Sequence, residues 1–201
     1  MSDPHLILAS ASPRRRELLD QLGLRYRVQP AHIAEHPRPG ELPETYVQRI
    51  AAEKSLAAQG LSDDTLPVLA ADTEVVLDGE IFGKPADRAQ AAGMLARLSG
   101  REHWVLSAVS LRHGAHHWEA LSISHLQFRD LTPAEIDLYW ATGEPCDKAG
   151  AYAIQGLGAL FVERLSGSYS GVMGLPLRET AGLLAHVGLD PLQSVMERGA
   201  R

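Results

Sequence analysis

Three consecutive arginines stand near the N-terminus, in the run Ser10-Ala11-Ser12-Pro13-Arg14-Arg15-Arg16. Ser12 is a good helix N-cap and Pro13 a good first helical residue, so the arginines are predicted to occupy the first turn of a helix. Cations in that turn oppose the helix dipole, at about 0.3–1 kcal/mol for each poorly placed charge. An anion bound to the free backbone N–H groups would make the same arginines favourable. The run therefore indicates either a phosphate site or a solvated basic turn that pairs with Glu17 and Asp20.

Lys54 is a charged residue on an apolar helix stripe. A helix is expected from about residue 44 to residue 59, and the stripe consists of Val47, Ile50, Ala51 and Ala58. A lysine on the inner face of a helix either extends its ammonium group to the surface or directs it at a ligand. Both interpretations remain open from the sequence.

Asp72 follows directly after an apolar strand that is expected over residues 67–71. A carboxylate at the C-terminal end of a strand commonly lies at the rim where α/β sheets bind ligands. At that place it could hold a divalent metal or take a proton from water. The alternative is that Asp72 and Thr73 begin a loop and bond their own backbone.

Two later segments place further charges beside glycine turns. Lys84 lies between Gly83 and Pro85, which would hold it in a rigid frame, and residues 144–148 bring Glu144, Asp147 and Lys148 together shortly before Gln155. The second group is typical of an anion-and-metal site, or of a turn held by salt bridges.

Other residues offer weaker support for chemistry. His113, His116 and His117 flank a predicted hairpin tip at Gly114, so we expect exposed histidines and not a metal cluster. Cys146 has no histidine nearby in the sequence, so a thiol nucleophile is unsupported. The sequence contains no P-loop, no G-x-G-x-x-G before a helix and no G-x-S-x-G elbow.

Composition sets limits on the class of protein. The 201 residues are 45% hydrophobic with a net charge of −6, which fits one folded α/β domain or two small lobes and disfavours disorder. No apolar run approaches the ~20 residues of a membrane span, and the order of charges around residues 6–9 is wrong for a secretory signal. A single cysteine is compatible with a reducing cytoplasm. The acidic balance argues against binding to a nucleic-acid polymer.

The expected elements mix strands and helices without strict alternation, which predicts an α/β fold with a mixed twisted sheet and helices packed on it. Strands are expected at residues 6–9, 26–28, 67–71, 74–77, 80–82, 103–112, 117–128 and, rich in glycine, 152–162. Helices are expected at 13–22, 44–59, 88–98, from 133 onward and at 177–187, with a proline-rich loop over residues 30–43. The pairs Asp78-Gly79 and Thr132/Glu135 predict a hairpin turn and a helix capping box.

These residues together resemble the Maf family of nucleoside triphosphate pyrophosphatases over nearly the whole chain. The family motif S-x-S-P-R-R matches residues 10–15, E-K matches 53–54, A-D-T-x-V matches 71–75, and G-K-P matches 83–85. L-S-G matches residues 98–100, D-K-A-G-x-Y-x-I-Q-G matches 147–156, and G-S-Y…G-L-P-L matches 167–169 and 174–177. Seven ordered blocks are far more specific than any one of them.

The resemblance implies a single Maf-like domain over residues 1–201, similar in fold to inosine triphosphatases, with a ligand cleft between two lobes. Its A-D-T and I-Q-G motifs look like the branch that hydrolyses dTTP and UTP to the monophosphate and pyrophosphate. It implies that Asp72 is catalytic and that Asp72 and Glu35 hold Mg²⁺ or Mn²⁺. The implied substrate-binding residues are Ser10, Arg14, Arg15, Lys54, Thr73, Lys84, Lys148 and Gln155. Arg15, Thr73 and Gln155 would bear on substrate choice.

The resemblance also implies a homodimer, and it contains one departure. The family usually has an aspartate-glutamate pair before the second helix, whereas this chain has Ala34-Glu35. Two other functions stay open: the same chemistry on 7-methyl-GTP or another modified purine, and a nucleotide-binding regulator of septum formation.

Overall fold

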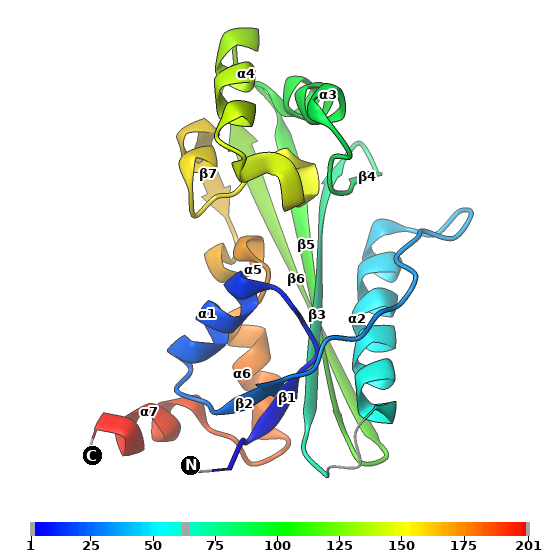
Figure 1. Cartoon of the computed structure of the whole chain (residues 1–201), viewed down its shortest axis with the longest axis vertical. Helices are drawn as coiled ribbons and strands as arrows, with labels where there is room; N and C mark the ends of the chain where they lie inside the picture. The colour runs from blue at the N-terminus through cyan, green and yellow to red at the C-terminus, as the bar shows by residue number, and fades with distance from the viewer. Residues whose placement is uncertain (1–2, 62–64, 200–201) are drawn as a thin grey trace.

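The computed structural model describes residues 3–61 and 65–199, which form one mixed sheet with helices on both faces (Figure 1). The strands are β1 (Leu6–Leu8), β2 (Tyr26–Val28), β3 (Val68–Leu77), β4 (Glu80–Phe82), β5 (Glu102–His113), β6 (His116–Phe128) and β7 (Val162–Ser166). Their order is β2-β1-β3-β5-β6-β7, with β4 paired to β3. β1 is parallel to β2 and to β3, and the other pairs are antiparallel, so the expected mixed α/β sheet is confirmed.

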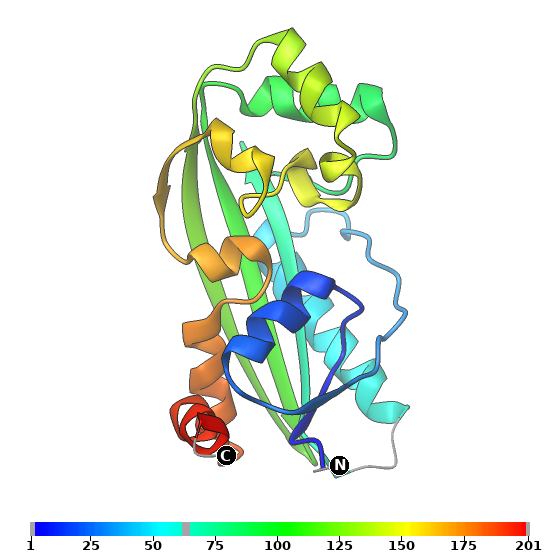
Figure 2. The ribbon, with the colours of Figure 1, turned by 60° about the vertical axis from the view of Figure 1, so that its left-hand side comes forward.

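Helices cover the sheet on two sides (Figures 1 and 2). The helices are α1 (Pro13–Gln21), α2 (Pro43–Gly60), α3 (Arg88–Leu98), α4 (Pro133–Ala141), α5 (Tyr169–Met173), α6 (Leu177–Ala185) and α7 (Pro191–Gly199). Three short 3-10 helices, η1 (Glu144–Asp147), η2 (Ala149–Ala151) and η3 (Leu157–Phe161), lie between α4 and β7. The sequence patterns did not predict α5 or α7.

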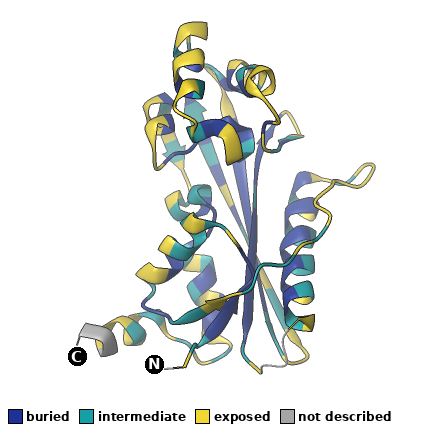
Figure 3. Ribbon diagram, viewed as in Figure 1, coloured by how far each residue is buried: buried dark blue, intermediate teal, exposed yellow. Residues whose placement is uncertain are grey.

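The long strands β3, β5 and β6 present alternate residues to different helices, because successive side chains of a strand point to opposite faces. Leu69 and Ala71 pack in one cluster with residues of α1 and α6. Val76 packs with residues of α2 on the other face. The middle of β3 is therefore buried on both sides, as Figure 3 shows in dark blue.

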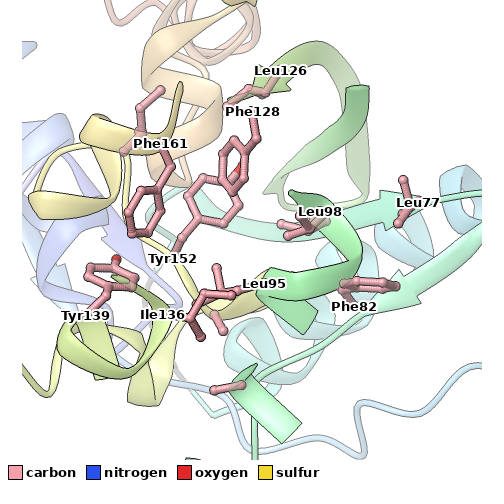
Figure 4. Packing of buried hydrophobic residues seen from close by; sticks show 14 of the residues in the cluster. Leu77, Phe82, Leu95, Leu98, Leu126, Phe128, Ile136, Tyr139, Tyr152 and Phe161 are labelled. Carbon is pink, nitrogen blue, oxygen red and sulfur yellow. The ribbon is translucent and has the colours of Figure 1, made fainter. Parts of the chain in front are cut away.

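A second hydrophobic core lies at the far end of the sheet, where α3, α4 and the 3-10 helices pack on the strands (Figure 4). Its aromatic members include Phe82, Phe128, Tyr139, Tyr152 and Phe161. This core and the one beneath α1 and α6 form two lobes on a shared sheet, because β3 and β5 contribute residues to both.

Several local predictions are confirmed. The Ser12 hydroxyl accepts a hydrogen bond from the Arg15 N–H, and Pro13 begins α1. Asp78 (φ 53°) and Gly79 (φ 78°) form the two-residue turn between β3 and β4, in which both positions need positive φ. Thr132 and Glu135 form the capping box of α4.

Two strand predictions are wrong. Residues 67–71 and 74–77 are not separate strands, because β3 runs without a break through Asp72 and Thr73 while pairing with β5. Asp72 therefore lies in the middle of a strand and not at its C-terminal end. Residues 152–162 do not form a strand either, since turns and η3 occupy them and β7 begins only at Val162. Three of their backbone N–H groups, those of Ala153, Leu157 and Gly158, bond to side chains and not to a neighbouring strand.

Across the described ranges, we find no helix that is both long and apolar enough to cross a membrane.

Candidate active site

The site lies where the edge of β3 is left uncovered. β1 pairs with β3 only at Val68 and Leu69, and β4 pairs with it only from Val75 onward. Within the described strands, residues 70–74 therefore pair with β5 on one side alone. A cleft of about 730 Å³ opens beside this gap. Asp72 lies in the middle of β3. Its parallel neighbour β1 ends beside Leu69, so Asp72 lies just past the C-terminal end of β1 and not past the end of its own strand.

The cleft collects every site residue that the family resemblance implied, whereas Arg16 and Glu144 are not among its lining residues. The collected residues are Ser10, Arg14, Arg15, Glu35, Lys54, Asp72, Thr73, Lys84, Lys148 and Gln155. They come from α1, α2, β3 and the loops after β1, β2 and β4, and from the segment between α4 and β7. The three histidines of the β5–β6 hairpin are not among the lining residues, and Cys146 is exposed.

Arg14 and Arg15 of α1 are held by distant carbonyl groups and not by Glu17 or Asp20, whereas Arg16 donates to the nearby Ala11 carbonyl oxygen. Arg15 donates from Nε to the Gly174 carbonyl oxygen at 2.8 Å and from Nη2 to Thr73 Oγ1 at 3.4 Å. Burial lowers the pKa of Arg15, although Asp72 opposes this shift. Arg14 donates to the Met173 carbonyl oxygen at 3.4 Å. The basic turn is therefore fixed against the loop after α5, with the guanidinium groups of Arg14 and Arg15 at the cleft.

Lys54 bridges two carboxylates at the floor of the cleft. Its Nζ lies 2.8 Å from Asp72 Oδ1 and 2.7 Å from Glu35 Oε2. Asp72 is 4% exposed, whereas the Glu35 side chain is 44% exposed. The charged group of Lys54 thus points into the site and does not extend to the surface, which decides between the two interpretations of the helix stripe. Its cation compensates a carboxylate that would otherwise be buried alone.

Glu74 is a further acidic residue of the cleft, which the sequence analysis missed. It is 8% exposed and lies two positions after Asp72, so both side chains are on the α2 side of β3. Burial raises the pKa of Glu74 to about 8, repulsion from Asp72 adds to the increase, and Lys54 opposes it. The alternation of side chains between the two faces of β3 could have placed Glu74 beside Asp72, but the sequence analysis predicted a strand break at Asp72.

Oxygen atoms on both β3 carboxylates lack hydrogen-bond partners. Asp72 Oδ2 and Glu74 Oε2 are buried and accept no hydrogen bond from the described residues. Carboxylate oxygens are the ligands that Mg²⁺ prefers, and that ion usually binds to one or two carboxylates together with substrate phosphates. The described side chains do not gather three His, Cys, Asp or Glu groups in the arrangement of a complete protein metal site. The donor set therefore fits an ion that is shared with a phosphate ligand.

The opposite wall carries cations and an amide. Lys148 forms an ion pair with Asp147, and Asp147 Oδ2 lies 3.8 Å from Arg14 Nη1. Lys84 and Gln155 are exposed residues of the cleft lining. The salt-bridged turn is confirmed for Asp147 and Lys148, which also line the cleft, whereas Glu144 of the same predicted group lies outside the lining.

The chain belongs to the Maf-like protein family, whose model matches residues 5–187. It is similar to the dTTP/UTP pyrophosphatase of Methylococcus capsulatus, with 63% identity over 187 residues that cover 93% of each chain. The dTTP/UTP pyrophosphatase of Cupriavidus metallidurans is 54% identical over 92% of this chain and 97% of that protein. These findings confirm the family that the sequence motifs indicated.

A solved structure also resembles part of the chain. It is the nucleoside-triphosphatase / dITP/XTP pyrophosphatase from Mycobacterium abscessus, with 16% identity and a TM-score of 0.39 over 61% of this chain and 72% of that chain. Similarity at this level adds nothing to the family assignment.

Proposed function

We propose that this protein hydrolyses pyrimidine nucleoside triphosphates, dTTP and UTP, to the monophosphate and pyrophosphate. The observation that carries the proposal is the single cleft in which Arg14, Arg15, Lys54, Lys84 and Lys148 surround Asp72. The names of the curated relatives support the choice of substrate and favour pyrimidines over 7-methyl-GTP. A turnover enzyme also accounts for the carboxylate beside the cations better than a regulator that only binds nucleotides.

Charge compensation is the first task of such a site. A nucleoside triphosphate carries about four negative charges, which must be neutralised before water can approach phosphorus. Arg14 and Arg15 are held by backbone carbonyls, so their guanidinium groups are oriented before the ligand arrives. Lys84 and Lys148 lie in the same cleft and add two further cations. Ser10 lies in the loop between β1 and α1, and its hydroxyl already accepts the Ser12 N–H.

Asp72 is the proposed catalytic residue. Water would attack the α-phosphorus, the bond between that phosphorus and the bridging oxygen to the β-phosphorus would break, and pyrophosphate would leave. Asp72 would orient the water and accept its proton. The Lys54 ammonium group donates to Asp72 Oδ1 at 2.8 Å and fixes this carboxylate in place. Thr73 and Gln155, also in the cleft, offer donors and acceptors for the edge of a uracil or thymine base.

A divalent cation, Mg²⁺ or Mn²⁺, is the proposed cofactor. Asp72 and Glu35 would hold it, as the family resemblance implies, and Glu74 is a third carboxylate within the same cleft. The unpartnered oxygens of Asp72 and Glu74 support this choice. When bound, the ion would neutralise phosphate charge. Ala34 supplies no ligand at the position where the family usually has aspartate.

The remaining assignments rest on the family resemblance and on the composition of the chain. We propose that the chain acts as a single domain, forms a homodimer and works in the cytoplasm, with the nucleotide as its ligand and without a nucleic-acid polymer or a membrane.

The Asp72→Asn variant tests the proposed function. The amide keeps the size of the side chain but cannot accept a proton, so we expect kcat for dTTP to fall by about 10²–10⁴-fold. The measurement is pyrophosphate release across a panel of dTTP, UTP, GTP and 7-methyl-GTP with Mg²⁺ or Mn²⁺. The matched control is Asp137→Asn, because Asp137 of α4 forms an exposed ion pair with Arg88 of α3. Full activity of Asp72→Asn would remove the catalytic assignment, and a wild-type preference for purines would remove the substrate assignment.

A further inference from the structure

Gln155 is carried by an irregular segment, residues 153–158, whose shape is not set by a strand or a long helix. The Gly156 N–H donates to the Ala153 carbonyl oxygen at 3.2 Å, which closes a turn with Gln155 near its tip. A single turn of this kind is weak support for a side chain that must meet a base in a fixed position. The segment therefore needs other contacts to hold it.

Glu144 supplies those contacts at the C-terminal end of the segment. Its Oε2 accepts the Leu157 N–H at 2.9 Å, and its Oε1 accepts the Gly158 N–H at 3.0 Å. Partial burial by itself raises the pKa of Glu144, but hydrogen bonds from Tyr139, Gly158 and Leu157 outweigh it, so the pKa lies below its ordinary value. The charged carboxylate is therefore the form that holds the segment.

Tyr139 extends the same contact to the N-terminal end of the segment. Its hydroxyl group donates to Glu144 Oε1 at 2.6 Å and accepts the Ala153 N–H at 3.0 Å. The ring is buried, 4% exposed, and packs edge-on against Phe161 with centroids 4.8 Å apart (Figure 4). Glu144 of η1 and Tyr139 of α4 thus hold both ends of the segment.

The two glycines of the segment show how closely it lies against this pair. A Cβ atom on Gly156 would lie 2.5 Å from Glu144 Cδ. A Cβ atom on Gly158 would lie 2.8 Å from the Tyr139 hydroxyl oxygen. The backbone can approach the carboxylate and the phenol only because neither position has a side chain. The segment therefore packs closely against Glu144 and Tyr139 at its two glycines.

We propose that Glu144 is a positioning residue that fixes Gln155 for the recognition of the pyrimidine base. It lies outside the cleft lining and acts through the backbone of residues 153–158 and not on the substrate. The inference rests on the proposed function, because it assigns Gln155 to the base and not to the phosphates.

The Glu144→Gln variant tests the proposal with two readouts. The amide keeps one acceptor oxygen and replaces the other with a donor, which faces a backbone N–H. We expect hydrogen exchange in a peptide that covers residues 153–158 to become at least about 10-fold faster. In the full-length enzyme we expect KM for UTP to rise about 10-fold with kcat within about 3-fold, so that the ratio of kcat/KM for UTP to that for GTP falls about 10-fold.

Matched variants separate positioning from general damage. Glu163→Gln, at an exposed position of β7, should change neither readout. Gln155→Ala should lower the UTP-to-GTP ratio, and adding Glu144→Gln to it should lower that ratio no further, because the two residues act as a unit. The proposal would be overturned if Glu144→Gln left hydrogen exchange in residues 153–158 unchanged, or if it lowered kcat/KM equally for UTP and GTP.

Failure of the proposed function would be recognised separately. A wild-type protein that releases no pyrophosphate from dTTP or UTP would refute that function. The ratio of the dissociation constants for UTP and GTP, measured by calorimetry, would then replace the kinetic ratio in the same set of variants. An unchanged ratio in Glu144→Gln would overturn the positioning role.

Discussion

Two glutamates near the cleft, Glu74 and Glu144, have opposite surroundings. Glu144 accepts hydrogen bonds from one hydroxyl and two backbone N–H groups, and its pKa is lowered. Glu74 is more deeply buried, its Oε2 has no partner among the described residues, and its pKa is raised to about 8 by burial and by Asp72.

The difference separates a structural carboxylate from one that faces a binding site. Buried polar groups in native proteins are nearly always hydrogen-bonded, so an exception calls for an explanation. Glu144 satisfies the rule and holds backbone in place. Glu74 and Asp72 break it at the edge of β3, beside a cleft lined with cations, where a bound cation would supply the missing partner.

Removing the positive charge of Lys54, which bonds to Asp72 and Glu35, should lower the stability of the protein. In Lys54→Met, Asp72 loses its partner while Glu74 remains two residues away, so we expect the free energy of unfolding to fall by about 3 kcal/mol at pH 7. Urea denaturation in the presence of a chelator measures it. Arg88→Met, which breaks an exposed ion pair on α3, should cost less than about 1 kcal/mol. A similar small loss in Lys54→Met would show that the acidic side of the cleft does not need this cation.

Removing one donor from the satisfied carboxylate should have a smaller effect. Tyr139→Phe deletes the hydroxyl group that bonds Glu144 and Ala153, so a buried N–H group loses its acceptor. We expect a loss of about 1–3 kcal/mol in the free energy of unfolding. Thermal and urea denaturation of the variant and the wild type measure the loss. An unchanged stability would mean that Glu144 and Tyr139 do not hold the segment as a unit.

Neutralising the unsatisfied carboxylate of Glu74 should have an effect of opposite sign, and one that depends on pH. The pKa of Glu74 is higher in the folded protein than in the unfolded chain, so stability is lost as pH rises from about 4.5 to about 8. Glu74→Gln removes this loss. We expect the variant to match the wild type near pH 4 and to be more stable at pH 9, in chelator, by up to about 5 kcal/mol. The measurement is urea denaturation over this pH range, and a variant that is less stable at pH 9 would contradict the interpretation.

The sequence predicted local structure well where the signals lie within a few residues. The Ser12-Pro13 helix start, the Asp78-Gly79 turn and the Thr132/Glu135 capping box all form as expected, because each is closed by bonds between near neighbours. Sequence patterns gave wrong strand boundaries where pairing with a distant segment determines the structure. β3 continues through the polar Asp72-Thr73 pair because β5 supplies an unbroken partner strand.

The sequence by itself determined which residue types were present and that their motifs belong to the Maf-like family. It could not determine which carboxylates would have partners. Glu144 meets Leu157 and Gly158 because 3-10 turns replace the expected strand, and Lys54 meets Asp72 because α2 packs on β3. Glu74 could be assigned to the site only once the structure showed that β3 is continuous and that its alternate side chains, Asp72 and Glu74, lie on the same face. Hydrogen-bond partners across a fold depend on packing between distant elements, and only the tertiary structure brings those elements together.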